Sequence, residues 1–183
     1  MRNFIPHLIL IVCLILLICA ASCTPQLVPY TARVQGETGL GEAELKKVQF
    51  YNSDRIVLFR EVGKNTTEIV SGEIKIVDGK QIEEIVINPL TPGVLVNSAD
   101  GKRFGISFEQ GPDRYLVFGL NPRKAGTYSI YGRDWRNHIA TVDYDGKEFK
   151  LAPQSSESIL LVNLKKLNGL KVNSRTARGR SVN

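Results

Sequence analysis

The segment Arg103-Phe104-Gly105-Ile106-Ser107-Phe108-Glu109 alternates strictly between large apolar side chains and other residues. Successive side chains of a β-strand point to opposite faces, so Phe104, Ile106 and Phe108 would lie together on one face. A strand with one apolar face covers a core with that face and leaves the other toward solvent. The segment therefore predicts a half-buried strand at residues 103–109.

Three Asp-Gly pairs lie between strand-like runs, at residues 78–79, 100–101 and 145–146. Asp-Gly is the pair that a type I′ hairpin turn favours. The sequence thus predicts three hairpins, which pair residues 73–77 with 80–87, 93–96 with 102–109, and 139–144 with 147–151. In the first hairpin the apolar parity changes between Ile82 and Ile85, and we expect a β-bulge at Glu83-Glu84 to absorb the change.

Further strands are expected at residues 55–61, 115–119, 126–131 and 159–162. The runs at 115–118 and 159–162 are apolar throughout, which predicts burial on both faces. About eight to ten short strands separated by turns indicate an all-β domain, an antiparallel β-sandwich or a small β-barrel, at residues 45–170. The leucines at 160, 161, 164, 167 and 170 also allow a short C-terminal helix.

The first 23 residues have the layout of an export signal. Arg2 is basic, the apolar run Leu8 to Ala21 follows, and Ala20-Ala21-Ser22 leads directly into Cys23. This arrangement resembles the signal peptide and lipobox of bacterial lipoproteins, although Ala20 stands where that class usually has Leu. The resemblance implies cleavage of residues 1–22 and lipidation of Cys23, which would anchor the chain to a membrane.

Two alternatives to a lipoprotein signal remain open: an ordinary secretory signal and an uncleaved helical anchor. The apolar run is shorter than the roughly 20 residues that a spanning helix needs, and no basic stop-transfer cluster follows. Thr24 is not Asp, and the sorting rule of the lipoprotein class then favours the periplasmic leaflet of the bacterial outer membrane. Each acyl methylene that is buried in lipid contributes about 0.8 kcal/mol to such an anchor.

All three cysteines, Cys13, Cys19 and Cys23, lie in the leader or at its end. A chain that begins at a lipidated Cys23 has no thiol left for a disulfide, a thiolate metal site or a nucleophile. The following residues, 24–44, contain two prolines and three glycines that break any period, and together with Cys23 they predict a flexible linker at 23–44. An alternative is that residues 27–34 add a strand to the domain.

The C-terminal end of the chain is basic and free of acids. Residues 163–183 carry six basic side chains: Lys165, Lys166, Lys171, Arg175, Arg178 and Arg180. Residues 171–183 are polar and predict a disordered tail. Anionic lipid, a cell-wall polymer or an acidic protein could bind it, or it could stay solvated without a partner. We expect no nucleic-acid partner, because an exported chain seldom meets one.

Few residues of the sequence are suited to catalysis. The histidines are His7, in the leader, and His138, and no phosphate-binding, nucleophile-elbow or zinc-protease motif occurs. Glu83 and Glu84 are adjacent in a strand, so they would point to opposite faces and are expected at a solvated edge. The sequence predicts a protein that is not an enzyme and that has no cofactor and no metal site.

One segment has the composition of a binding site: Tyr131, Arg133, Trp135 and Arg136 lie close together between two predicted strands. Trp, Tyr and Arg are the residue types enriched at binding hot spots. A loop that presents them could bind a sugar or a partner protein. The alternative is that Trp135 folds back over the open end of the core, since tryptophan is highly buried on average.

We therefore expect a membrane-anchored periplasmic lipoprotein with a structural or assembly role, in which the β domain docks onto an envelope protein complex such as a secretion machine. In overall plan it is similar to the small sandwich lipoproteins that attach the type VI secretion complex to the outer membrane, a likeness that carries no residue motif. The alternative is a periplasmic module that binds a glycan or another small ligand through the Trp135 loop.

Overall fold

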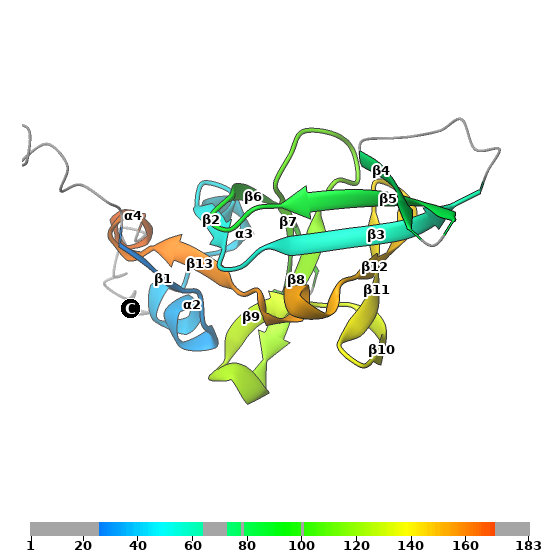
Figure 1. Cartoon of the computed structure of the whole chain (residues 1–183). Coiled ribbons are helices and arrows are strands. Elements are labelled where there is room, and N and C mark those ends of the chain that lie inside the picture. The colour runs from blue at the N-terminus through cyan, green and yellow to red at the C-terminus, as the bar shows by residue number, and fades with distance from the viewer. Residues whose placement is uncertain (1–25, 64–72, 78, 100, 171–183) are drawn as a thin grey trace, which may run out of the picture.

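The computed structural model describes residues 26–63, 73–77, 79–99 and 101–170, and in them thirteen strands form two antiparallel sheets (Figure 1). The seven-stranded sheet has the order β1 (Leu27–Pro29), β13 (Leu160–Asn163), β2 (Gln49–Asn52), β6 (Pro92–Ala99), β7 (Arg103–Ser107), β8 (Leu116–Asn121) and β9 (Thr127–Ile130). The six-stranded sheet has the order β10 (Arg133–Arg136), β11 (Ile139–Tyr144), β12 (Lys147–Leu151), β3 (Ile56–Val62), β5 (Lys80–Ile87) and β4 (Glu73–Val77). The predicted all-β sandwich is confirmed.

The three predicted hairpins are present as β4–β5, β6–β7 and β11–β12. Asp145 and Gly146 have φ values of 53° and 69°, as a type I′ turn requires. The β6–β7 hairpin differs from the prediction, because Ala99 pairs with Arg103 and three residues therefore form its connection. Its register also shifts between Leu95 and Asn97, so a bulge interrupts this hairpin.

The bulge predicted at Glu83-Glu84 is wrong. The register of β5 runs without a break against both β3 and β4. Glu83 instead lies on the same face as the buried Ile85 and Ile87, and its side chain is 1% exposed. Arg60 on β3 places its Nε 2.5 Å from Glu83 Oε2, and this ion pair allows a carboxylate on the core side. The expected solvated edge is therefore wrong for Glu83, although Glu84 does point to the other face and contacts Lys75.

The seven-stranded sheet curls until its two ends meet. Bridges join Thr31 to Thr127 and Ser129 to Ile159, so β9 lies against the chain that leaves β1 and the chain that enters β13. Tyr30 fills the interior at this junction and is fully buried. Its ring contacts those of Phe50, Phe104 and Tyr128 at centroid distances of 5.4, 5.8 and 5.4 Å. Burial raises the pKa of the Tyr30 hydroxyl well above its usual value.

The flexible linker predicted at residues 23–44 is wrong from residue 26 onward. Leu27 to Pro29 form β1, which pairs with β13, and the alternative of an added strand thus holds for these three residues. Helix α2 (Ala32–Thr38) follows, with the Thr31 hydroxyl accepting from Val34 N at 3.2 Å and Gly39 ending it at a φ of 60°. Helix α3 (Glu42–Leu45) then buries Leu45. The prolines and glycines of this segment start and end short elements that belong to the domain.

The predicted C-terminal helix is present as α4 (Leu164–Gly169). The Asn163 side chain accepts a hydrogen bond from Lys166 N at 3.2 Å, which caps the helix, and Leu167 is 1% exposed against the core. The burial on both faces that we expected for the apolar runs is only partial. Leu116 and Phe118 are buried on β8, whereas Val117 between them is half-buried.

The leader, Cys23 and the tail at 171–183 lie outside the described residues. The predictions made for them are therefore not addressed by the fold. Within the ranges that the structure does describe, no helix has the length and apolarity needed to cross a bilayer.

Candidate functional site

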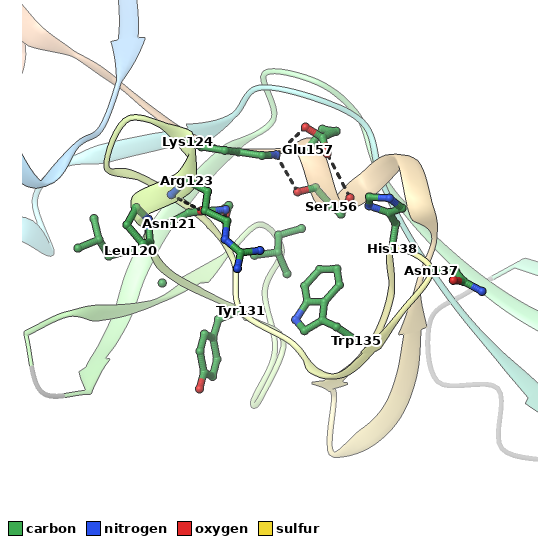
Figure 2. A pocket seen from close by; sticks show the side chains of 14 residues that line it. Leu120, Asn121, Arg123, Lys124, Tyr131, Trp135, Asn137, His138, Ser156 and Glu157 are labelled. Atoms are coloured by element: carbon green, nitrogen blue, oxygen red, sulfur yellow. Dashed lines mark hydrogen bonds and ion pairs between the residues drawn. The ribbon is translucent and has the colours of Figure 1, made fainter.

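A groove of about 590 Å³ lies between three elements of the chain (Figure 2). One wall is the turn between β8 and β9, which contains the short 3-10 helix η1 (Pro122–Lys124). The second wall is the β10–β11 hairpin, and the third is the 3-10 helix η2 (Pro153–Glu157). The groove volume falls in the range of about 300–1,000 Å³ that is typical of small-molecule sites.

Trp135 lies on a strand and not on the loop that we expected, because Arg133–Arg136 forms β10 at one edge of the six-stranded sheet. The turn after it has φ values of 49° at Asn137 and 64° at His138, the combination of a type I′ hairpin. Trp135 is 45% exposed and lines the groove, so the alternative in which it covers the core is wrong. Its Nε1–H donates to the carbonyl of Gly132 at 2.9 Å, which leaves the face of the indole to solvent.

Tyr131 precedes β10 and is 52% exposed. It lines the groove around Trp135 and also a neighbouring depression of about 370 Å³. Its ring lies against Gly119, where a Cβ atom would come within 3.0 Å of it. On the side of the depression the Arg103 guanidinium is 5.3 Å from the ring centroid, a cation–π contact.

The two arginines that we grouped with Trp135 lie elsewhere. Arg133 forms ion pairs with Asp143 and Glu148, with N–O distances of 2.8 and 3.0 Å, and lines the neighbouring depression. Arg136 is exposed and does not line the groove. Adjacent residues of an extended strand point to opposite faces, and the left-handed φ of 52° at Asp134 disturbs β10 further. Of the four predicted binding residues, the structure brings Trp135 and Tyr131 to the groove.

Three charged groove residues were not predicted from the sequence: Arg123, Lys124 and Glu157. His138, at the end of the segment that was predicted to bind a ligand, lines the groove as well. The Arg123 side chain is exposed, and among the described residues its guanidinium makes no hydrogen bond or ion pair. Lys124 Nζ, in contrast, lies 2.6 Å from Glu157 Oε2 and 3.3 Å from the Ser156 carbonyl oxygen. The sequence contains one local signal for this wall of the groove, the Asn-Pro pair at 121–122. This pair predicts a sharp turn, but it does not indicate which residues lie opposite the turn.

The hydrogen bond from Lys124 and its positive charge hold the pKa of the Glu157 carboxyl below its usual value, with a smaller contribution from the nearby His138. In Figure 2 the Arg123 side chain extends toward the Trp135 indole, and His138 lies on the other side of it. The positive charge of Lys124 is therefore balanced within the groove. The Arg123 guanidinium extends toward the indole, and its positive charge has no anionic partner in the described part of the chain.

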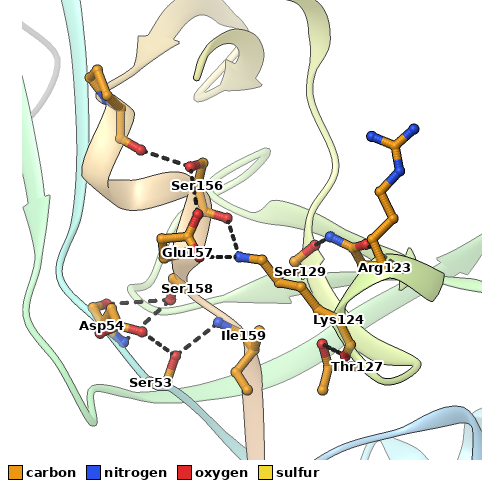
Figure 3. A network of polar contacts seen from close by, with 12 residues as sticks. Ser53, Asp54, Arg123, Lys124, Thr127, Ser129, Ser156, Glu157, Ser158 and Ile159 are labelled. Carbon is orange, nitrogen blue, oxygen red and sulfur yellow. Dashed lines mark hydrogen bonds and ion pairs between the residues drawn. The ribbon is translucent and has the colours of Figure 1, made fainter. Parts of the chain in front are cut away.

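A network of short polar contacts fixes η2, the third wall (Figure 3). The Ser53 hydroxyl donates to Asp54 Oδ2 at 2.6 Å and accepts from Ile159 N at 2.9 Å. The fully buried Ser155 accepts from Val57 N at 2.8 Å, which ties η2 to β3. These contacts join the start of β3 and the residues before it to the middle of η2 and to the chain just after η2, and so they hold Glu157 beside Lys124.

The groove offers binding groups and no evident acid–base pair. His138 has no hydrogen bond to a hydroxyl among the residues the structure describes, and the Ser156 hydroxyl donates to the Pro153 carbonyl at 2.7 Å. Over those same ranges, no group of three His, Cys, Asp or Glu residues is close enough to hold a metal ion. The arrangement is suited to stacking a ring on Trp135 and to binding an anion at Arg123.

Of the basic residues predicted as a C-terminal site, the structure describes two and leaves four outside its described ranges. Lys165 and Lys166 are exposed on α4. Lys171, Arg175, Arg178 and Arg180 lie outside the described residues.

Comparison of the chain with protein-family models, with curated proteins and with solved structures finds no match.

Proposed function

We propose that this chain is a bacterial lipoprotein, anchored through Cys23 in the periplasmic leaflet of the outer membrane, whose β domain docks onto an envelope protein. The leader sequence supports the anchor. The open edge of the six-stranded sheet, strand β4, supports the docking role and carries the proposal.

All five residues of β4 are exposed, and the strand pairs only with β5 in the described part of the chain. Its apolar side chains are unusually accessible, at 38% for Ile74, 75% for Ile76 and 51% for Val77. The strand also carries Glu73 and Lys75, but the Lys75 ammonium is paired with Glu84 of the neighbouring β5. An edge strand with exposed apolar side chains and free N–H and C=O groups is a template for pairing with another chain. Natural proteins normally cover or charge such an edge, so an uncovered one is a candidate interface.

The other edge of the same sheet, β10, is built differently. Three of its four residues are charged: Arg133, Asp134 and Arg136. Its register against β11 is irregular, and Asp134 has a φ of 52°. Charges and bulges are the features that prevent edge pairing. The contrast supports β4 as the edge that takes a partner, with an extended segment of the partner protein as the occupant.

The position of β1 limits where such a partner can be. Leu27 is four residues after Cys23, and a chain extends by at most about 3.3–3.6 Å per residue, so a lipidated Cys23 would hold β1 within about 14 Å of its anchor. Leu27 pairs with Asn163, which caps α4, so Lys165 and Lys166 would lie at the membrane side. Figure 1 places β4 at the opposite end of the molecule from α4 and β1. A domain tethered in this way presents β4 away from the bilayer.

Photocrosslinking in intact cells tests the docking role. A photoreactive amino acid at position 76 should give one major heavier adduct with an envelope protein, identified by mass spectrometry. The matched control is position 96, since Val96 is also exposed, at 40%, but lies on the interior strand β6. Absence of an adduct at position 76, or equal adducts at both positions, would contradict docking through β4.

The anchor is tested separately by the intact mass of protein purified from membranes. We expect loss of residues 1–22 and acyl chains on Cys23, and release of the Cys23→Ser variant from the membrane. An intact N-terminal Met1 with an unmodified Cys23 sulfur would contradict the anchor and leave the docking result to be judged by itself.

A second candidate function is the binding of a glycan or another small ligand in the groove around Trp135. The observation in its favour is the exposed indole beside an arginine without a partner among the described residues.

A further inference from the structure

The groove combines an open aromatic face at Trp135 with a cation, Arg123, that has no anionic partner in the described part of the chain. Together these two features indicate which kinds of ligand could bind. The Trp135 N–H is satisfied by the Gly132 carbonyl, so the indole offers its ring face. The face of an aromatic ring is the negative part of its quadrupole and attracts positively polarised groups. The C–H groups on one side of a pyranose ring are such groups, and a flat sugar ring covers an indole well.

Charge complementarity distinguishes an acidic sugar from a neutral one. Lys124 is paired with Glu157 at 2.6 Å, and His138 faces the same carboxylate. Arg123 has no such partner among the described residues, and its guanidinium extends toward the indole (Figure 2). The guanidinium is a planar fork of donors that matches the two oxygens of a carboxylate.

The backbone that carries Arg123 is fixed before any ligand binds. The Asn121 side chain accepts from Arg123 N at 3.1 Å and donates from its Nδ2 to the Ser129 hydroxyl at 3.1 Å. Ser129 is buried on β9, so this contact ties η1 to the sheet. The opposite wall is held by the network of Figure 3. A preformed groove loses less conformational entropy on binding than a mobile loop does.

We infer that the groove binds a carboxylate-bearing glycan, with a sugar ring against Trp135 and the carboxylate on Arg123. This inference rests on the second candidate function, ligand binding, and is independent of docking through β4. At about 590 Å³ the groove accommodates one or two sugar rings.

Two disaccharides provide the test because they differ by one acidic group. N-acetylglucosaminyl-N-acetylmuramic acid carries a lactyl carboxylate, and N,N′-diacetylchitobiose, called chitobiose below, is its neutral counterpart. Trp135 is the sole tryptophan of the chain, so a change in the tryptophan fluorescence of the purified protein reports on the groove directly. Isothermal titration calorimetry gives the affinities of variants that lack the indole.

We expect the acidic disaccharide to bind about tenfold more tightly than chitobiose, as one charge-assisted contact would produce. Arg123→Gln should remove that preference and leave the affinity for chitobiose unchanged. Arg136→Gln is the matched control, because it removes the same charge from the neighbouring hairpin outside the groove, and it should keep the preference.

Trp135→Ala should abolish binding of both disaccharides, and Trp135→Phe should retain part of it. Unchanged thermal unfolding of each variant shows that the domain is still folded. Equal affinity for both sugars in the unaltered protein would overturn the acidic-glycan inference while leaving ligand binding intact. No binding of either sugar would overturn both the inference and the candidate function on which it rests.

Discussion

The two sheets of this protein differ at their edges: the ends of one sheet meet, and the edge strands of the other are exposed. The seven-stranded sheet joins its ends through Thr31–Thr127 and Ser129–Ile159, and the buried Tyr30 fills the junction. In the described part of the chain, the six-stranded sheet ends at β4 and β10 with no further strand beside them, and Ile76 and Trp135 are exposed there. The closed sheet thus provides stability. The open sheet leaves accessible groups at its two edges, which is where we place the protein contact and the ligand groove.

The largest expected effect is a difference in stability between two aromatic-to-alanine substitutions, one in the closed sheet and one at the edge of the open sheet. Tyr30→Ala should lower the free energy of unfolding by about 3–5 kcal/mol, because it empties a closed aromatic interior. Trp135→Ala should lower it less, by about 1 kcal/mol, because the side chain is 45% exposed and lies at the edge of its sheet. Urea unfolding monitored by circular dichroism measures both. Equal costs would show that residues 26–31 are not part of the stable domain.

The buried ion pair of the open sheet is expected to give the next largest effect. Glu83→Leu leaves the Arg60 guanidinium, 19% exposed, without its carboxylate and should cost about 2–3 kcal/mol. The double variant Arg60→Met with Glu83→Leu should recover most of that loss, since the buried charge is gone from both sides. A double variant as unstable as Glu83→Leu alone would mean that packing at these positions, and not the unpaired charge, sets the cost.

A gain in stability is predicted in the closed sheet. The Tyr30 hydroxyl is buried and has no hydrogen-bond partner among the described residues. Tyr30→Phe removes that unsatisfied group while keeping the ring, and should raise the free energy of unfolding by about 1 kcal/mol. Loss of stability in this variant would indicate that the hydroxyl does have a partner.

The smallest effect concerns the pH dependence at the groove. Lys124 lowers the pKa of Glu157 in the folded chain. The pair therefore stabilises the fold at pH values above the ordinary glutamate pKa of 4.5, and this contribution is lost as the pH falls through the lower folded value. Lys124→Gln should move the Glu157 pKa upward in an NMR titration of the side-chain carboxyl. An unchanged titration would remove Lys124 as the cause.

The hairpins were predictable from the sequence because their signals are local. Asp-Gly pairs specify turns, and the alternation at 103–109 identifies Phe104 and Ile106 as core residues. The half-buried strand predicted there is wrong, because β7 ends at Ser107 and its other face is buried too, with the side chains of Asn97 and Tyr115 against Gly105. Residues 26–45 were not predictable, since Tyr30 becomes part of the core only through rings that lie 20 or more residues away in the sequence. The prolines and glycines suggested a linker, whereas tertiary contacts make the segment part of the folded domain, with β1 in the sheet and α2 and α3 beside it.

The groove, too, could be predicted only where a local sequence signal exists. Trp135 and Tyr131 were found because their residue types are enriched at binding sites. Arg123 and Glu157 were missed, because 34 residues separate them in the sequence and neither has a motif. Glu83 was assigned to solvent because nothing in the sequence identifies Arg60 as its partner across the sheet.

Amide hydrogen exchange of the isolated protein tests most directly whether the two sheets differ as proposed. We predict that the backbone amides of β7 and β8, inside the closed sheet, exchange only through global unfolding. The amides of β4 that do not pair with β5 should exchange orders of magnitude faster, because an open edge leaves them to solvent. Protection of the whole of β4 at the level of β7 would show that this edge is already covered, and would contradict the account of β4 as the docking strand.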